Sequence, residues 1–279
     1  MSITKKILDL IRETSSSLPE DVEKALRRAM RREDAASSAK VVLKTILDNC
    51  ALARKASTPL CQDTGTLTFF VDASLRRRVT RKVISQAVAL ATEKGYLRKN
   101  CIDSVDGRSY DDNVAEGAPV IHYVEGGELP AGSVTLIMKG GGSENMSRQY
   151  SLPDSSLGAG RDLAGVEKCV LDAVQKAQGY GCAPGVLGVC IGGDRATGFE
   201  TAKEQLLRQL DDKSGDPRLA KLESSLLSKA NSLGIGPMGL GGKTTLLGLK
   251  IAARPRVPAS FFVTVAYMCW AARRRSITI

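Results

Sequence analysis

Three cysteines stand beside loop signals, where their thiols could act as metal ligands or as nucleophiles. Cys61 opens the loop Cys61-Gln62-Asp63-Thr64-Gly65, Cys182 lies in Gly181-Cys182-Ala183-Pro184-Gly185, and Cys269 follows an apolar stretch. They are 121 and 87 residues apart, so no short spacing of the CxxC type marks a metal site. A single cysteine of this kind is more often a small buried hydrophobe. We interpret the other four in that way, namely Cys50, Cys101, Cys169 and Cys190.

Four glycine-rich loops could bring backbone N–H groups close to a ligand. They span residues 61–65, 139–145, 181–185 and 234–243, and each adjoins an apolar run. Any one of them could be an ordinary tight turn, but glycines of this density also leave room for a bound group. The last loop contains Gly242-Lys243-Thr244, which resembles a phosphate-binding loop. Pro237 stands where that pattern requires glycine, so we reject nucleotide binding by this loop.

Composition narrows the class of protein and its partners. The 279 residues carry a formal net charge of +10, which could attract nucleic acid, an anionic substrate or an acidic partner. The basic residues are scattered apart from the run Arg273–Arg275, and no stacking aromatics are interleaved with them, so nucleic acid is disfavoured. The sequence has no apolar stretch of about 18 residues, so we predict no membrane span. Met1–Arg12 lacks the apolar region of a secretory signal. Seven cysteines, an odd number, indicate a reducing cytoplasm.

Hydrophobic periodicity predicts a mixture of helices and strands. The predicted helices fall within residues 3–54, 82–94, 162–178, 200–209 and 219–233. The predicted strands are 67–72, 120–125, 134–139, 186–191, 246–252 and 261–268, with a long loop over 99–117. This order favours an α/β fold in which a mixed sheet is flanked by helices. Since no linker or repeat is visible, we expect one continuous domain over residues 1–279, which includes a helical segment at about 1–55.

Several runs together resemble one enzyme family. The chain is similar to the α subunit of class I fumarate hydratases and L-tartrate dehydratases, which are iron–sulfur hydro-lyases. The runs that carry the resemblance are Pro59-Leu60-Cys61-Gln62-Asp63-Thr64-Gly65, Leu97-Arg98-Lys99-Asn100, Lys139-Gly140-Gly141-Gly142-Ser143-Glu144-Asn145-Met146-Ser147, Gly181-Cys182-Ala183-Pro184, Ile191-Gly192-Gly193, Ser232-Leu233-Gly234-Ile235-Gly236, Gly239-Leu240-Gly241-Gly242 and Cys269-Trp270-Ala271. They follow the family's order across nearly the whole chain.

The resemblance implies a cofactor and a set of site residues. It implies a 4Fe–4S cluster held by Cys61, Cys182 and Cys269. Three protein ligands would leave one iron open to act as a Lewis acid on the substrate.

The resemblance also makes Asp63 a candidate acid/base, with Gln62, Arg98 and the Gly141 backbone contacting substrate. Two plainer roles stay open. Asp63 could cap its own turn through the backbone of residues 64–66, and Arg98 could be a solvated charge at a helix end.

The family also implies a partner, a substrate class and a reaction. A separate β subunit would complete the active site of a hetero-oligomer that hydrates fumarate to malate or dehydrates tartrate. The chain ends soon after Cys269, the third of the implied cluster ligands, as a separate α subunit would. Val257 takes the place of a histidine in the family's pattern, and its side chain neither titrates nor donates hydrogen bonds. The alternative is therefore a catalytically degenerate member that acts as an interaction or regulatory subunit. His122, the only histidine, is expected in the core or at a sheet edge.

Overall fold

The computed structural model describes residues 1–125 and 129–279. Their contacts group into two compact units, and the chain passes from one to the other four times. Unit 1 comprises residues 1–19, 48–141 and 271–279, and unit 2 comprises residues 20–47 and 142–270. Because the units are interleaved along the chain, no linker in the sequence announces them.

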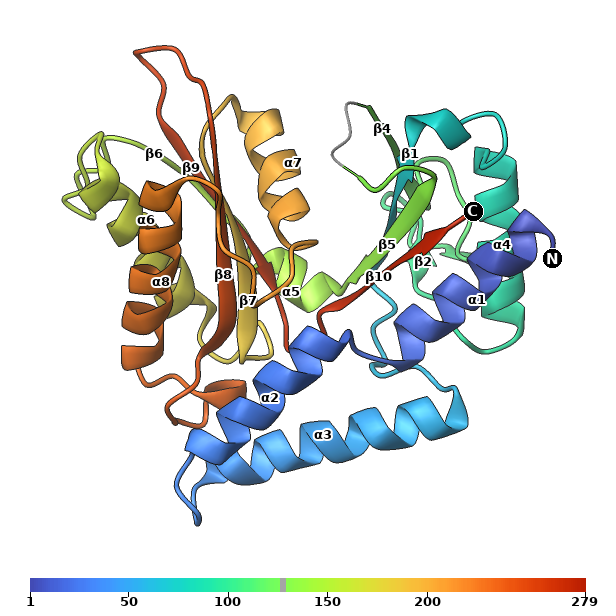
Figure 1. The fold of residues 1–279 in the computed structure, drawn as a ribbon, viewed down its shortest axis with the longest axis horizontal. Coiled ribbons are helices and arrows are strands. Elements are labelled where there is room, and N and C mark those ends of the chain that lie inside the picture. Colours follow the sequence, from blue (N-terminus) through green and yellow to red (C-terminus); the bar gives the residue numbers. More distant parts are fainter. Residues whose placement is uncertain (126–128) are drawn as a thin grey trace. The chain divides into compact units, whose positions relative to one another are not determined.

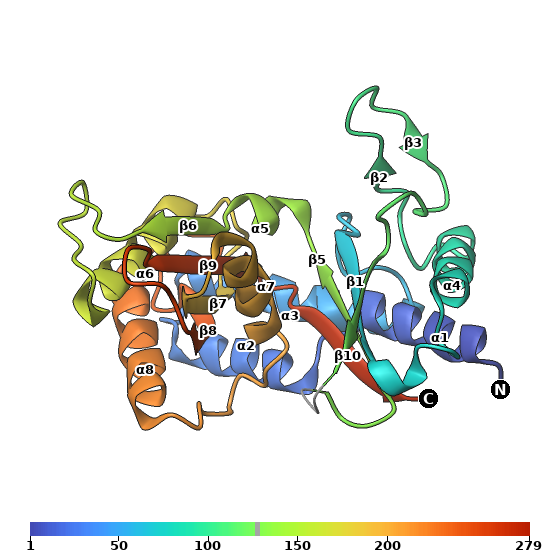
Figure 2. The same ribbon diagram turned by 90° about the horizontal axis from the view of Figure 1, so that it is seen from above.

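Unit 1 is a four-stranded sheet with two helices packed together on it. The strand order is β10 (Arg273–Thr278), β5 (Ser133–Lys139), β1 (Thr66–Asp72) and β4 (Val120–Val124). Only the β1–β4 pair is parallel. Helices α1 (Ile3–Ser16) and α4 (Arg81–Glu93) lie side by side, and α1 contacts β5 and β10 (Figure 1). A short hairpin of β2 (Cys101–Ile102) and β3 (Ser109–Tyr110) extends beyond the rest of this unit (Figure 2).

Unit 2 is a second mixed sheet with helices on both faces. Its strand order is β6 (Arg148–Ser151), β9 (Phe262–Met268), β7 (Gly185–Gly192) and β8 (Leu246–Arg254). Only β7 and β8 run parallel. One face is covered by α6 (Leu163–Ala177) and α8 (Pro217–Ser232), and the other by α7 (Arg195–Gln205) (Figure 1). This unit also contains α2 (Glu20–Arg32), part of α3 (Ser38–Ala56) and most of α5 (Gly141–Asn145).

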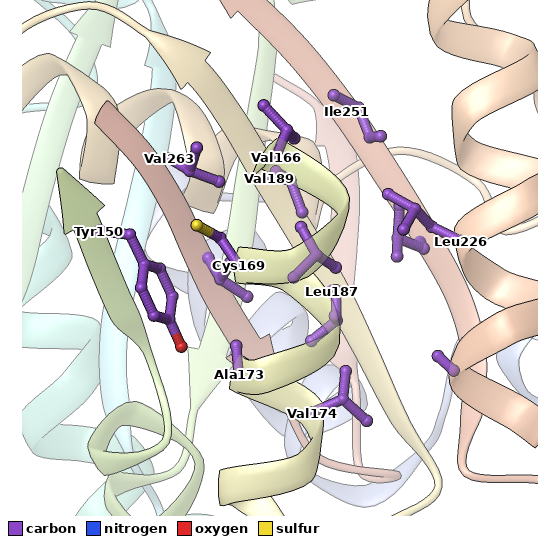
Figure 3. Close-up of a cluster of buried hydrophobic side chains, with 14 of the residues drawn as sticks. Tyr150, Val166, Cys169, Ala173, Val174, Leu187, Val189, Leu226, Ile251 and Val263 are labelled. Atoms are coloured by element: carbon purple, nitrogen blue, oxygen red, sulfur yellow. The ribbon is translucent and has the colours of Figure 1, made fainter. Parts of the chain in front are cut away.

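The core of unit 2 explains why its strands are nearly all apolar. Figure 3 shows Val166 and Val174 of α6 among Leu187 and Val189 of β7, in a cluster that Leu226 of α8 also joins. Every residue of β7 is buried because helices cover both of its faces. Capping side chains set where the helices begin. Asp162, for example, accepts a hydrogen bond of 2.7 Å from the Gly165 N–H at the start of α6.

The predicted fold class is confirmed, since both large sheets are mixed and flanked by helices. Each predicted strand and each predicted helix has a counterpart, although α7 begins at residue 195 rather than 200. A single continuous domain over 1–279 stays a prediction. None of the helices in the described residues is both long and apolar enough to cross a membrane.

Four strands and one α-helix escaped the sequence analysis, and two of these strands, β2 and β3, form the hairpin inside the long loop expected over 99–117. The short edge strand β6 has little apolar periodicity, and α5 occupies the glycine run expected to be a loop. The basic run Arg273–Arg275 was interpreted as a patch of charge, but it begins β10, and Arg273 and Arg274 are buried. Long aliphatic stems let arginines serve as strand residues when their polar ends find space within the unit.

Gly188, in the middle of β7, is required by the close approach of α7. A Cβ at this position would lie 1.9 Å from the Ala202 carbonyl oxygen. We expect Gly188→Ala to lower the free energy of unfolding by about 2 kcal/mol, because the helix must move away from the sheet. Urea unfolding measures this loss. In Gly215→Ala the added methyl group meets nothing within 4 Å, so this control should keep the wild-type midpoint. Equal midpoints for the two variants would contradict the close approach.

Candidate functional site

The loop Cys61–Gly65 of unit 1 is organised by hydrogen bonds within itself. The Asp63 N–H donates to Cys61 Sγ at 3.4 Å, and the Gly65 N–H donates to Asp63 Oδ1 at 2.8 Å. The second bond is the local turn cap that was left open as the plainer role of Asp63. Cys61 is half-buried, and Gln62 is exposed.

The Asp63 carboxylate also collects donors from two distant segments of unit 1. Its Oδ2 atom accepts the Gly141 N–H at 2.7 Å, and its Oδ1 atom accepts Asn100 Nδ2 at 3.2 Å. A Cβ on Gly140 would lie 2.9 Å from Oδ2, so the carboxylate and the glycine run fit closely. An ionised carboxylate is only an acceptor, and it can therefore satisfy all three donors at once. Asp63 thus joins its own loop to the residues that follow β5 and α4.

Arg98 is fixed to the same loop through its backbone. The Thr64 hydroxyl donates to the Arg98 carbonyl at 2.9 Å and accepts the Arg98 N–H at 2.9 Å. Asn113 donates a second hydrogen bond of 2.9 Å to that carbonyl. The Arg98 side chain is exposed. Its backbone is therefore immobilised while its guanidinium group remains available to an anionic ligand.

Arg273 supports this loop from inside unit 1, and the sequence analysis missed it. The side chain is 1% exposed, and its Nη2 donates to the Asp63 carbonyl oxygen at 2.8 Å. Its Nε and Nη1 atoms are buried and have no hydrogen-bond partner in residues 1–125 and 129–279. Burying a cation with so few hydrogen-bond partners costs free energy. The hydrogen bond to Asp63 is the contact that links Arg273 to the candidate site. The family-like run Cys269-Trp270-Ala271, which ends two positions before Arg273, was the sequence signal that could have identified this residue.

A cavity of about 320 Å³ adjoins these residues in unit 1. Gly65, Asn100, Asn113 and Gly141 contribute to its lining. Three of them, Gly65, Asn100 and Gly141, donate to Asp63, so the cavity wall and the carboxylate belong to one hydrogen-bonded arrangement. The volume is within the range of small-molecule sites.

Cys182 and Cys269 come together within unit 2. The Trp270 N–H donates to the Cys182 carbonyl at 3.1 Å, which joins the two cysteine loops directly. Cys182 is exposed and has a φ of +53°, a left-handed conformation that is uncommon outside glycine. Cys269 is half-buried. Burial raises the pKa of the neighbouring Tyr267 hydroxyl, and the negative charges of Cys269 and Cys182 raise it further.

Of the remaining cysteines, Cys50, Cys169 and Cys190 are buried as the sequence analysis expected, whereas Cys101 is only half-buried. Burial raises the pKa of Cys169 and of Cys190 to about 11, so both stay protonated at neutral pH. Burial, followed by the charge of Asp112, also raises the pKa of Cys101. Cys50 is buried in α3. A thiolate is the form that binds metal, so these sites are poor ligands.

Two of the three cysteines that the resemblance implies as cluster ligands fit as a pair. Cys182 and Cys269 lie on adjoining loop ends, and the Cys61 sulfur accepts an N–H in the manner common for iron–sulfur ligands. Cys61 belongs to unit 1. Over residues 1–125 and 129–279, no three His, Cys, Asp or Glu side chains are grouped as ligands of a single metal ion.

Comparison with known proteins places the chain in a family. The family model described as "Fumarate hydratase (Fumerase)" matches residues 4–278. The chain belongs to the fumarate hydratase family. A relative from Geobacillus stearothermophilus, named as a proposed class I fumarate hydratase, is 48% identical over 280 residues. The match covers 99% of this chain and 54% of the relative, so the chain spans about half the length of that protein.

Two other relatives of similar length carry a different name. A proposed L(+)-tartrate dehydratase subunit alpha from Methanocaldococcus jannaschii is 36% identical, with 98% of this chain and 96% of the relative covered. The L(+)-tartrate dehydratase subunit alpha of Escherichia coli K12 is 28% identical, with 99% and 90% covered. The predicted resemblance to both groups of hydro-lyases is therefore confirmed.

The predicted site residues divide between the two units. Unit 1 contains Cys61, Gln62, Asp63, Arg98 and Gly141, and unit 2 contains Cys182 and Cys269. Hydrogen bonds join Asp63 to Gly141, and Thr64 to Arg98, which the sequence analysis had linked only through the resemblance. The Gly141 N–H, expected to face substrate, donates to Asp63 instead. Substrate binding through that N–H would therefore compete with Asp63.

Three other residues from the sequence analysis also have defined places. His122 of β4 stacks on Phe70 with ring centroids 5.1 Å apart, as suits a sheet residue. Val257 is 64% exposed, on the segment between β8 and β9. The Lys243 N–H donates to both oxygens of the Glu33 carboxylate at 3.0 Å, so an acidic side chain already contacts the loop that resembled a phosphate site.

Arg273 offers a test of how the Asp63 loop is held. We expect Arg273→Met to raise amide hydrogen exchange at Gly65 and Gly141 about fivefold, because one hydrogen bond to Asp63 is lost. The midpoint of urea unfolding should change little, since removing a buried charge offsets that loss. Arg275→Met is the control, because Arg275 lies on the same strand and contacts Glu13 at 3.5 Å. Unchanged exchange at both glycines would show that Arg273 does not hold the loop.

Proposed function

We propose that this chain is the α part of a 4Fe–4S-dependent hydro-lyase. Its reaction would be the reversible hydration or dehydration of a small dicarboxylate. Hydration of fumarate to malate is the preferred reaction, and dehydration of tartrate is the second choice. Cys61, Cys182 and Cys269 would hold the cluster, Asp63 would act as the acid/base, and Gln62, Arg98 and Gly141 would bind substrate. Since thiolate ligands and an open iron need reducing conditions, we expect a cytoplasmic protein.

The arrangement around Asp63 carries this proposal. Its carboxylate accepts hydrogen bonds of 2.7 and 2.8 Å from Gly141 and Gly65, and Thr64 ties in the backbone of Arg98. Cys61 is two residues away and accepts the Asp63 N–H. A thiol, a carboxylate and the backbone of an exposed arginine are thus joined with a cavity to which Gly65, Asn100 and Gly141 contribute. Membership of the fumarate hydratase family supports hydro-lyase chemistry for that set.

Each residue has a distinct task in this mechanism. When bound, the cluster would supply a Lewis-acidic iron that takes up the charge of the departing hydroxyl group. The exposed Arg98 guanidinium can hold a substrate carboxylate with two parallel hydrogen bonds. Asp63 can exchange a proton at the carbon next to that carboxylate, provided that a donor such as the Gly141 N–H releases it. Released in this way, the Gly141 N–H can stabilise negative charge on the substrate.

A second polypeptide or segment is needed to complete the pocket in this proposal. Two relatives are named as α subunits, and the chain matches about half of the Geobacillus relative. We therefore propose a separate β subunit and a hetero-oligomer. Thr64, next to Asp63, is hydrogen-bonded to the backbone of the exposed Arg98, and a dicarboxylate has a second charged group that would need a further cation.

Val257 supports a second candidate, a degenerate subunit. The side chain is exposed, and its loop is well formed because Arg256 donates to the carbonyls of Val257, Pro258 and Ser260 at 3.0 to 3.2 Å. An ordered loop that carries valine in the place of histidine offers no proton donor there. Loss of activity without loss of the cluster would favour this candidate.

Metal analysis followed by an assay tests the proposal. The chain is purified anaerobically and assayed for iron and sulfide, and then for hydration of fumarate and dehydration of malate and tartrate with the β partner added. We expect about four irons and four sulfides per chain. Turnover of one substrate supports the hydro-lyase, whereas a full cluster without turnover supports the degenerate subunit. A protein without iron or sulfide would refute both versions.

The ligand set is tested by single substitutions. We expect Cys61→Ser, Cys182→Ser and Cys269→Ser each to lose the cluster, because an alcohol does not replace a thiolate. Iron content and the visible absorption spectrum are the measurements. Cys101→Ser is the matched control, since Cys101 is likewise half-buried in unit 1 but is excluded from the set. Wild-type iron content in all three variants would rule out these ligands.

Asp63 is tested by Asp63→Asn. We expect the cluster to remain and kcat to fall about 100-fold, because an amide cannot take up the proton. Iron content and steady-state rates measure the two effects. Asp111→Asn is the control, because Asp111 is exposed and pairs with Lys99 at 3.2 Å, so its loss should change neither quantity. An unchanged kcat in Asp63→Asn would remove Asp63 from the mechanism and leave it as a turn cap.

A further inference from the structure

Tyr267 of β9 has a buried hydroxyl group that is not satisfied within the described residues. The side chain is 2% exposed, and its hydroxyl oxygen has no hydrogen-bond partner. A buried hydroxyl without a partner is unfavourable, and such groups in native proteins usually have an explanation. Phenylalanine would fill the same space without that cost. The presence of tyrosine therefore indicates a partner that the chain alone does not contain.

The position of the ring indicates where such a partner would bind. A Cβ on Gly181 would lie 2.4 Å from a carbon of the ring, and a Cβ on Gly185 would lie 2.6 Å from the hydroxyl oxygen. The ring thus packs directly against the loop that contains Cys182. Cys269 is two residues after Tyr267, and its loop is joined to Cys182 by the Trp270 N–H. The unsatisfied hydroxyl therefore lies against the loop of residues 181–185, which the Trp270 N–H joins to the Cys269 loop.

We propose that the Tyr267 hydroxyl donates a hydrogen bond to a sulfide of the cluster bound at this site, and thereby stabilises the bound cofactor. The inference rests on the proposed function, because the acceptor exists only when the cluster is bound. Tyr267 is a positioning residue in this scheme and does not contact substrate. Its hydroxyl has one proton to donate, and sulfur that carries negative charge is a suitable acceptor.

This role has consequences that differ between the empty and the loaded protein. In the empty protein the hydroxyl contributes nothing, so removing it leaves stability unchanged or improved. In the loaded protein a hydrogen bond to sulfur raises the reduction potential of the cluster and slows its loss. In this scheme the Tyr267 hydroxyl stabilises the bound cofactor and does not stabilise the fold.

Tyr150 provides a matched control in the same core. It is also buried, at 8% exposed, and Figure 3 shows it in its core cluster. Tyr267 belongs to the same cluster. Its hydroxyl, however, donates to Asp172 Oδ2 at 2.7 Å. Tyr150→Phe therefore removes a satisfied hydroxyl, and Tyr267→Phe removes an unsatisfied one. The two variants lose the same atom from the same core.

The experiment compares both variants with the wild-type chain, with and without the cluster. For the empty chain, urea midpoints should be equal or higher in Tyr267→Phe and lower in Tyr150→Phe. After reconstitution, Tyr267→Phe should lose its cluster to a chelator about fivefold faster than wild type and show a lower reduction potential. Tyr150→Phe should keep the wild-type rate and potential.

Three results would overturn the inference. Wild-type chelation rate and potential in Tyr267→Phe would show that the hydroxyl does not contact sulfur. A lower urea midpoint in empty Tyr267→Phe would show that the hydroxyl already has a partner in the chain. A wild-type chain that takes up no iron and sulfide would refute the proposed function, and this inference with it. The first two results leave the proposed function intact.

Discussion

The carboxylate of Asp63 is the interaction on which the candidate site in unit 1 depends. One side chain accepts hydrogen bonds from Gly65 in its own loop, from Gly141 after β5, and from Asn100 after α4. Its carbonyl oxygen accepts a fourth from the buried Arg273 of β10. A carboxylate can satisfy several N–H donors at once, so it joins segments that share no strand pairing.

Glycines make this arrangement possible through the absence of a side chain. Gly65 has a φ of +74°, and a Cβ there would lie 2.4 Å from the Lys139 carbonyl oxygen. The same solution recurs in unit 2, where Gly181 and Gly185 accommodate the ring of Tyr267 beneath Cys182. The loop that contains Cys61 thus packs against the backbone of Lys139, and the loop that contains Cys182 packs against the ring of Tyr267. Close packing restricts the positions open to the cysteine backbone, which favours a preorganised site.

Because some basic side chains are buried, the net charge of the sequence overstates the positive charge at the surface. The chain has a net charge of +10, yet the densest basic run is partly interior, with Arg273 and Arg274 at 1% and 6% exposed. An interior arginine contributes little to a surface that attracts polyanions, but it can anchor a loop. The net charge is thus compatible with the small dicarboxylate substrate proposed above.

The sequence by itself determined the order and type of nearly all elements, because apolar periodicity and turn residues are local properties. It also identified the motif residues of the family, including Asp63, Arg98 and the three cysteines. It missed β10 and Arg273, because three consecutive arginines resemble a solvated surface until the strands of unit 1 enclose them. Tertiary structure alone decided that Gly141 donates to Asp63, 78 positions earlier in the sequence, and that the buried Tyr267 hydroxyl has no hydrogen-bond partner among the described residues. Hydrogen bonding and burial are set by atoms brought together from distant positions, and a single sequence contains no record of that proximity.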